Sequence, residues 1–204
     1  MPIKIALSIL LSFFLCQATM AEVGTPYQKL SKTDFVKFFN IHEVGRKTSE
    51  TGDTLIDLKP GGFKQHIDIQ VSIDSSGVIR SASLRIDRSW LGDRRSVNRL
   101  GSDLVKSFLA TFSPQKALPK IAPLVQAIWK SKGARDQVIQ LKKSSEPSSP
   151  HGQALVGLEA FMGNRASYSL PLDSATLSMN NGPIDGRQRL QCEIRSLSPT
   201  KSAD

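Results

Sequence analysis

One alternating segment constrains the fold of this chain more than any other. Residues 66–73 place apolar and polar side chains at every second position, as a strand with one buried and one wetted face does. Asp74-Ser75-Ser76-Gly77 follows as a turn sequence, with Gly77 suited to a positive φ. A return strand over 78–90 then alternates in the same way. The apolar face carries Ile67, Ile69, Val71, Ile73, Val78, Ala82, Leu84, Ile86 and Trp90, and the polar face carries His66, Asp68, Gln70, Ser72, Ser81, Ser83, Arg85 and Asp87.

Further strands are predicted on both sides of this hairpin. Leu55–Leu58 precedes it, so the first β region covers about 53–91. A second β region, about 154–195, is expected to hold strands at Leu155–Met162, Ser167–Leu172 and Ala175–Met179, with turns at Gly163-Asn164 and Asn180–Gly182. In its last strand, Leu190, Cys192 and Ile194 alternate with Gln191, Glu193 and Arg195. Gln137–Leu141 is a further short candidate.

Helical spacing of apolar residues predicts two helices between these regions, at about 94–112 and 120–131. Pro123 is expected in the first turn of the second helix, which would then start near residue 120. A short N-terminal helix over 31–41 would be capped by Ser31 with Asp34. Strands, then helices, then strands indicate an α+β fold in which helices cover one face of an antiparallel sheet.

The first 21 residues have the layout of a secretory signal peptide. Lys4 precedes an apolar run from Ile5 to Leu15, and small residues follow at Ala18 and Ala21. The run is shorter than the roughly 20 apolar residues that cross a bilayer. Cleavage is expected after Ala21, with Ala18 as the second choice. Lipidation of Cys16 is disfavoured because Phe13, Phe14 and Leu15 precede it, where a lipobox has small residues.

The remainder is expected to be a single domain over 22–195. Residues 142–152 are polar and rich in Ser and Pro, and are interpreted as a flexible loop joining two strands. Residues 196–204 are expected to be a disordered tail. No later segment has the length and hydrophobicity of a transmembrane helix.

Cysteine usage points to the compartment. After cleavage Cys192 is the one remaining cysteine, and the sequence has no Asn-x-Ser/Thr acceptor. Small secreted animal domains usually depend on several disulfides. An exported protein without an internal disulfide therefore fits a bacterial envelope compartment, the periplasm first and the external medium second. Whether Cys192 is free or pairs with another chain is left open.

Net charge and sequence motifs restrict the classes of function that the chain can be expected to have. The net charge of +9 attracts polyanions such as lipid headgroups, lipopolysaccharide or acidic wall polymers. The histidines (His42, His66, His151) lack metal-ligand spacing, and no phosphate loop is present. Ser113-Pro114-Gln115-Lys116 matches Ser-x-x-Lys, but so does the tail at Ser198–Lys201, and no companion motif follows. No catalytic set, metal or cofactor is predicted.

An arginine cluster is the one unusual local feature. Guanidinium groups bind carboxylate and phosphate bidentately, and tryptophan stacks on rings or cations. The alternative interpretation is a solvated face on which Arg85 and Arg88 pair with Asp87 or Asp93. The predicted binding residues are Arg85, Arg88, Trp90, Arg94, Arg95 and Arg99.

These observations favour a small exported non-catalytic protein that binds an envelope protein or an anionic envelope component through the arginine-rich surface. Nucleic acid is not an expected partner. One alternative is an envelope hydrolase without a recognisable motif, with acid–base groups drawn from Asp57, His66, Asp68 and Glu159. Another is a lipid or small-ligand carrier in which Phe35, Phe38 and Phe39 line an apolar cavity.

Overall fold

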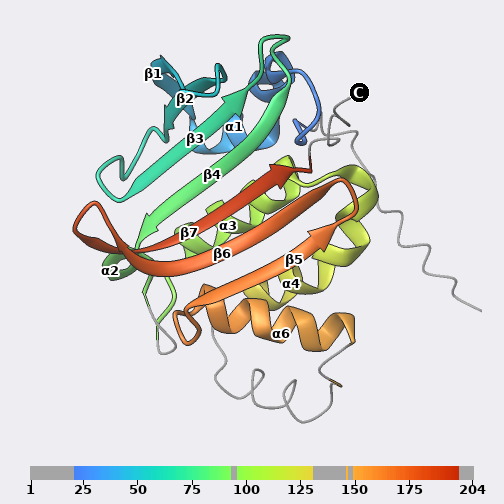
Figure 1. Ribbon diagram of the computed structural model, residues 1–204. Helices are drawn as coiled ribbons and strands as arrows, with labels where there is room; N and C mark the ends of the chain where they lie inside the picture. The colour runs from blue at the N-terminus through green and yellow to red at the C-terminus, as the bar shows by residue number, and fades with distance from the viewer. Residues whose placement is uncertain (1–20, 93–95, 131–145, 147–148, 198–204) are drawn as a thin grey trace, which may run out of the picture.

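The computed structural model describes residues 21–92, 96–130, 146 and 149–197, and shows one seven-stranded antiparallel sheet with helices on one face (Figure 1). The strand order is β1-β2-β3-β4-β7-β6-β5. This is the α+β architecture that the sequence pattern predicts. With η marking 3-10 helices, the elements are η1 (Tyr27–Lys32), α1 (Asp34–Phe39), β1 (His42–Thr48), β2 (Thr54–Lys59), β3 (Ile67–Ile73), β4 (Ile79–Asp87), α2 (Arg88–Leu91), α3 (Arg99–Phe112), η2 (Gln115–Ala117), α4 (Leu118–Lys130), α6 (Pro150–Phe161), β5 (Ser167–Leu172), β6 (Ala175–Ile184) and β7 (Arg187–Ser196).

The centre of the sheet joins two distant parts of the sequence. β4 pairs antiparallel with β7, which places Leu84 opposite Cys192 and Arg85 opposite Gln191. The predicted hairpin of β3 and β4 is present, with Ile69 opposite Leu84. Its apolar face is buried and its polar face is not covered by a described helix, as the alternation predicts.

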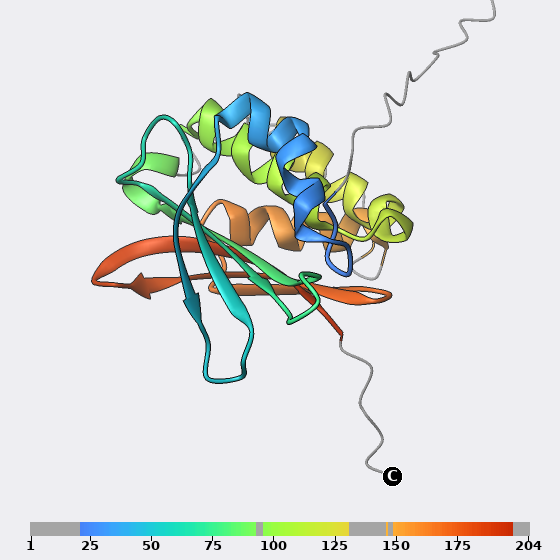
Figure 2. The same ribbon diagram turned by 90° about the horizontal axis from the view of Figure 1, so that it is seen from above.

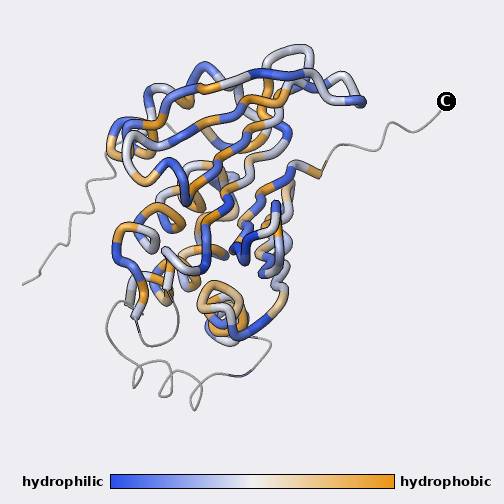
Figure 3. The backbone as a smooth tube through the Cα atoms, turned by 90° about the vertical axis from the view of Figure 1, so that its left-hand side faces the viewer, coloured by the Kyte–Doolittle hydropathy of each residue, from blue (hydrophilic) through white to orange (hydrophobic). Residues whose placement is uncertain are grey.

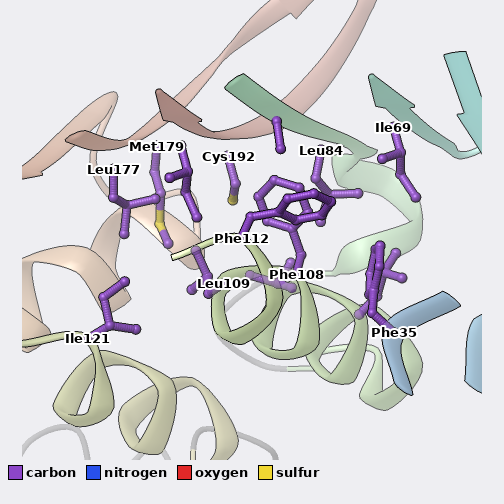
Figure 4. Packing of buried hydrophobic residues seen from close by; sticks show 14 of the residues in the cluster. Phe35, Ile69, Leu84, Phe108, Leu109, Phe112, Ile121, Leu177, Met179 and Cys192 are labelled. Atoms are coloured by element: carbon purple, nitrogen blue, oxygen red, sulfur yellow. The ribbon is translucent and has the colours of Figure 1, made fainter. Parts of the chain in front are cut away.

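The hydrophobic core lies between the sheet and the helices (Figure 4). α3 presents Leu104, Phe108 and Phe112 to the sheet, and all three are buried. Phe35 of α1 packs edge-on against Phe108 and Phe112, with ring centroids 6.2 and 5.9 Å away. Truncating a buried phenylalanine to alanine typically costs about 3–5 kcal/mol, so these aromatic contacts hold α1 and α3 on the sheet.

Two helix starts differ from the prediction because other residues cap them. α3 begins at Arg99 rather than near 94, since the Asn98 side chain accepts hydrogen bonds from the Leu100 and Gly101 N–H groups at 3.0 and 3.3 Å. α1 is capped by Thr33 rather than by Ser31. The predicted helix over 31–41 is split between η1 and α1, which ends at Asn40 in a left-handed conformation.

Pro123 lies inside α4 and not in its first turn. The helix starts at Leu118, so Pro123 is its sixth residue. Proline removes the N–H that would bond to the carbonyl four residues earlier, which belongs to Pro119. Pro119 is exposed, so the missing donor does not leave a residue of the core without a partner, and the helix continues through Pro123 to Lys130.

The segment Leu155–Met162, predicted to be a strand, is helical. α6 runs from Pro150 to Phe161, with Ser149 accepting a hydrogen bond from the Gly152 N–H at 3.0 Å. Residues 154–161 are apolar at almost every position, so neither strand nor helix periodicity is visible there. Residues 150–152, predicted as the end of the flexible loop at 142–152, are instead the first residues of α6, so this segment leads into a helix and not into a strand. Residues 142–145, 147–148 and the candidate strand 137–141 lie outside the described residues.

The ends of several strands also differ from the prediction. β4 stops at Asp87, so Trp90 belongs to α2 and not to the return strand. β6 continues through the predicted turn at Asn180–Gly182 to Ile184, and the chain reverses at Asp185 and Gly186, which both have positive φ. β1 was not predicted, because it is a polar edge strand interrupted by a bulge between Glu43 and Gly45.

The termini of the described domain are held by backbone pairing. Ala21 is buried, and the Val23 N–H donates to the Phe112 carbonyl at 3.0 Å. Ser196 ends β7, and the Leu197 N–H donates to the Ser174 carbonyl at 2.9 Å. The prediction of a disordered tail over 196–204 is therefore wrong for Ser196 and Leu197, which pair with the sheet and with Ser174; residues 198–204 lie outside the described residues. The described helices include none long and apolar enough to cross a bilayer.

Replacing Gly157 with leucine is expected to destabilise the fold although leucine is the better helix former. A Cβ there would lie 2.8 Å from Leu124 and 3.0 Å from the ring of Tyr168. Overpacking of this kind typically costs about 1–3 kcal/mol. Urea unfolding of Gly157→Leu measures the loss, with His151→Leu at an exposed position of α6 as control. Equal stability of the two variants would contradict this packing of α6.

Candidate binding groove on the open face of the sheet

The face of the sheet away from the helices is polar and carries the candidate site. Figure 2 shows the helices gathered on one side, and Figure 3 shows hydrophobic and hydrophilic residues alternating along the strands. Side chains of neighbouring strands align in rows across this open face. One row is Asp57, Gln70, Ser83 and Glu193, and the next is Asp68, Arg85 and Gln191.

The β1–β2 hairpin projects to the side away from the helices (Figure 2). A groove of about 650 Å³ lies between the tip of this hairpin and strands β3, β4 and β7. A second hollow of about 450 Å³ lies closer to Lys59 and Asp185. The two hollows share Gln70, Ser83 and Arg85, so they continue into one another across β3 and β4. We call this combined space the open-face groove.

Most charges along the groove are already paired within the protein. Arg80 lies 2.8 Å from Asp74, and Arg195 lies 2.7 Å from Glu193. The amide of Gln70 donates to Asp57 at 2.7 Å. These contacts leave little net charge, so the groove is a surface of hydrogen-bonding groups and not a broad cationic patch.

An ion-pair network with a buried centre borders the smaller hollow, which Lys59 and Asp68 line. Arg189 and Asp87 are only 7% and 6% exposed, and the Arg189 Nε lies 3.0 Å from Asp87 Oδ1. Arg189 also contacts Asp68 at 2.5 Å, and Lys59 pairs with the same carboxylate. His66 Nδ1 lies 3.1 Å from Asp87 Oδ2. A network with each member paired is rigid, so it fixes the side chains beside Arg85.

Burial raises the pKa of Asp68, but the hydrogen bonds and charges of Lys59 and Arg189 together outweigh it. The pKa of this carboxyl therefore lies below its ordinary value. Asp68 is held as a carboxylate at neutral pH, where it neutralises its two cations.

Arg85 differs from Arg80 and Arg195, the other arginines that line the groove. It forms no hydrogen bond or ion pair within the described part of the chain, and its buried Nε has no partner. The Ser83 hydroxyl, two residues earlier on the same face, is also buried and unpartnered. A buried polar group without a partner costs about 1–3 kcal/mol. Arg85 and Ser83 both line the two hollows, so a ligand in the groove would lie beside them.

Arg85 and Arg88, predicted to belong to one surface, are not brought together. Arg85 lies on the open face, whereas Arg88 reaches the helix side. There its Nε donates to Asn181 Oδ1 at 2.9 Å and an Nη donates to the Ala160 carbonyl at 3.0 Å. Burial lowers the pKa of Arg88 to about 10, so it stays charged at neutral pH while tying α6 to β6. Asp87, suggested as a partner for both, pairs instead with His66, Arg187 and Arg189.

Trp90 also makes contacts within the protein. It lies against His66, with ring centroids 6.0 Å apart and nearly parallel planes, and against Phe63 at 5.2 Å. Gly101 of α3 leaves room for it, since a Cβ there would lie 3.1 Å from the indole. Arg99 is exposed at the start of α3. Arg94 and Arg95 lie outside the described residues, as does Asp93.

The residues suggested for a hydrolase are dispersed. His66 is bonded to Asp87 and Glu159 lies on α6, while Asp57 and Asp68 both line the smaller hollow. A general acid needs a raised pKa, whereas the pKa of Asp68 is lowered. Among the described residues, no group of three or more His, Cys, Asp or Glu is placed to hold a metal ion.

The phenylalanine helix docks on the core. Phe35 and Phe39 are buried and Phe38 is 74% exposed. The hollow beside α1, about 310 Å³, is lined by Val36 and Ile41 and not by these phenylalanines. Cys192 is fully buried, and burial raises the pKa of its thiol to about 12, so it is not placed to pair with another chain.

Sequence reasoning identified the polar faces of single strands but missed the groove. Gln70 and Ser83 were assigned to the polar face of the first hairpin and Gln191 to that of the last strand. Their convergence depends on the pairing of β4 with β7, for which local alternation carries no signal. Compared with protein-family models, curated proteins and solved structures, the chain matches none. The candidate site therefore stands on its own geometry.

Stability is expected to depend on pH through Asp68. A carboxyl whose pKa is lowered on folding stabilises the protein above its unfolded pKa, near 3.8, and loses that contribution as the pH falls through its folded value. Asp68→Asn should therefore be less stable than wild type at neutral pH, and the difference should shrink in acid. Denaturant unfolding across this range tests it, with Asp185→Asn, 3.7 Å from Arg189 and exposed, as control.

Arg88→Met is expected to lower the free energy of unfolding by about 1–3 kcal/mol, because Asn181 Oδ1 loses its donor and the Ala160 carbonyl loses one of several donors. Arg99→Met, an exposed arginine, should change it little. Chemical denaturation of both variants measures the difference. A wild-type midpoint for Arg88→Met would show that this arginine is not a structural tie.

Proposed function

We propose that this is an exported, non-catalytic binding protein that holds an anionic component of the bacterial envelope in the open-face groove, with Arg85 as the charged contact. The single observation that carries the proposal is Arg85 itself. It is a guanidinium without a partner among the described residues, set among polar side chains that are paired and held in place.

Export is proposed from the first 21 residues, whose charge and hydrophobicity follow the signal-peptide layout. A bacterial envelope contains many anionic polymers, and the net charge of +9 draws the protein toward them. That attraction is general and screened by salt. The groove adds a defined position at which one anionic group can be bound and oriented.

A hydrolase remains the second candidate because Asp57 and Asp68 line the same hollow. Paired carboxylates on either side of a bound chain are the usual machinery of glycoside hydrolysis. The binding function is favoured because Asp68 is engaged by Lys59 and Arg189 and has a lowered pKa. Mass analysis of a captured component, before and after incubation, separates binding from cleavage.

Capture from an envelope extract tests the proposal. The full chain is expressed, purified and immobilised, and bound material is eluted in steps of increasing salt. We expect Arg85→Met to lose a discrete anionic component that wild type retains, because the fork that binds the anion is gone. Arg99→Met removes the same charge outside the groove and serves as the matched control.

The two variants give opposing outcomes. Loss with Arg85→Met and retention with Arg99→Met supports a groove-bound anion. Equal, shallow losses in both would mean that net charge alone drives capture, which contradicts the proposal. Retention of a protein by both variants would favour an interaction surface elsewhere on the molecule.

A further inference from the structure

Resting on the proposed function, we propose that the open-face groove binds a carboxylated saccharide chain, with the carboxylate on Arg85 and the sugar hydroxyls on the flanking amides and acids. The proposal names the chemical class that the lining residues of this one site would select. It follows from what surrounds Arg85 rather than from the arginine alone.

The surroundings of Arg85 favour a ligand that carries few charges. Asp68 and Gln191 are its direct cross-strand neighbours, and Asp57 lines the same hollow. Among the described residues that line the groove, two cations lack a paired acid, Arg85 and the exposed Lys47 of β1. A ligand with a charge on every unit would meet Asp57 and Glu193 with only these two cations to offset them, and like charges repel.

The same acids suit hydroxyl groups. A carboxylate only accepts hydrogen bonds, and a hydroxyl donates one and accepts others. Asp57 and Glu193 can therefore accept from sugar hydroxyls, while the amides of Gln70 and Gln191 both donate and accept. The Ser83 hydroxyl adds an unpartnered group to this set. Such a lining matches a polyhydroxylated ligand better than an acyl chain.

The shape of the groove favours a chain over a compact molecule. Two hollows, about 650 and 450 Å³, meet at Gln70, Ser83 and Arg85. The space thus extends on both sides of Arg85, and residues of the β1–β2 hairpin line both hollows. A saccharide with its carboxylate at the middle would place neutral units in each hollow.

Titration calorimetry with defined probes tests the class. The main probe is an oligosaccharide in which uronic acid alternates with a neutral amino sugar. Its carboxyl-reduced form is the neutral control, and a glycerol phosphate oligomer supplies anionic charge as phosphate. We expect the alternating oligosaccharide to bind and the reduced form to bind at least about tenfold more weakly, the usual size of one charge-assisted contact.

Variants locate the contact. Arg85→Met should weaken binding of the acidic probe by at least about tenfold, while Arg85→Lys, which keeps the charge but loses the fork, should recover part of it. Arg99→Met should bind as wild type does. Because Arg85 variants could unfold, side-chain amide NMR signals of Gln70 and Gln191 in wild type give an independent readout, and both should shift with the acidic probe.

Each outcome decides one of the two proposals. Equal binding of the acidic and reduced oligosaccharides, or amide signals that do not move, would overturn the carboxylate assignment. Arg85-dependent binding of the glycerol phosphate oligomer alone would overturn the saccharide class and leave the proposed function intact. No binding of any anionic probe, together with no Arg85-dependent capture from envelope extract, would overturn both.

Discussion

The pairing of β4 with β7 is the interaction on which the rest of the structure depends. It joins the strands of the N-terminal half to those of the C-terminal half, so that α3 can pack Phe108 and Phe112 on a continuous apolar surface. It also fixes the register that sets Arg85 beside Gln191. A slip of one residue would exchange the two faces of β7, burying its charges and exposing Cys192. The same hydrogen bonds between β4 and β7 therefore position both the core on one face of the sheet and the groove on the other.

Much of the fold could be predicted because its strands and helices carry local patterns. Alternation defined β3, β4 and β7, and helical spacing defined α3 and α4. The errors fell where no period is visible. α6 is apolar at nearly every position. β1 is a polar edge strand with a bulge, and both of these features protect a sheet edge from pairing with another chain. Capping residues such as Asn98 then decided boundaries that spacing alone placed too early.

The candidate site was predictable only in part, because arginines that are close in the sequence need not lie on the same surface of the folded protein. Arg85 and Arg88 are three residues apart, yet the end of β4 separates them to opposite sides of the sheet. The alternation of side chains along β4 correctly predicted that Arg85 lies on the open face. The partners that neutralise its neighbours come from β2, β3 and β7, and long-range pairing of this kind leaves no trace in a local window.

The balance of charge around the groove limits what kind of recognition it can perform. A surface of unpaired arginines would hold any polyanion, and its affinity would fall steeply with salt. Here most of the acids and bases are paired, and Lys59 and Asp68 belong to a network whose central members, Arg189 and Asp87, are almost fully buried. Selectivity must then come from the positions of hydrogen-bonding groups around one free guanidinium. Placing that guanidinium beside acids disfavours highly charged ligands, so the same carboxylates that keep the strands in register also restrict what Arg85 can bind.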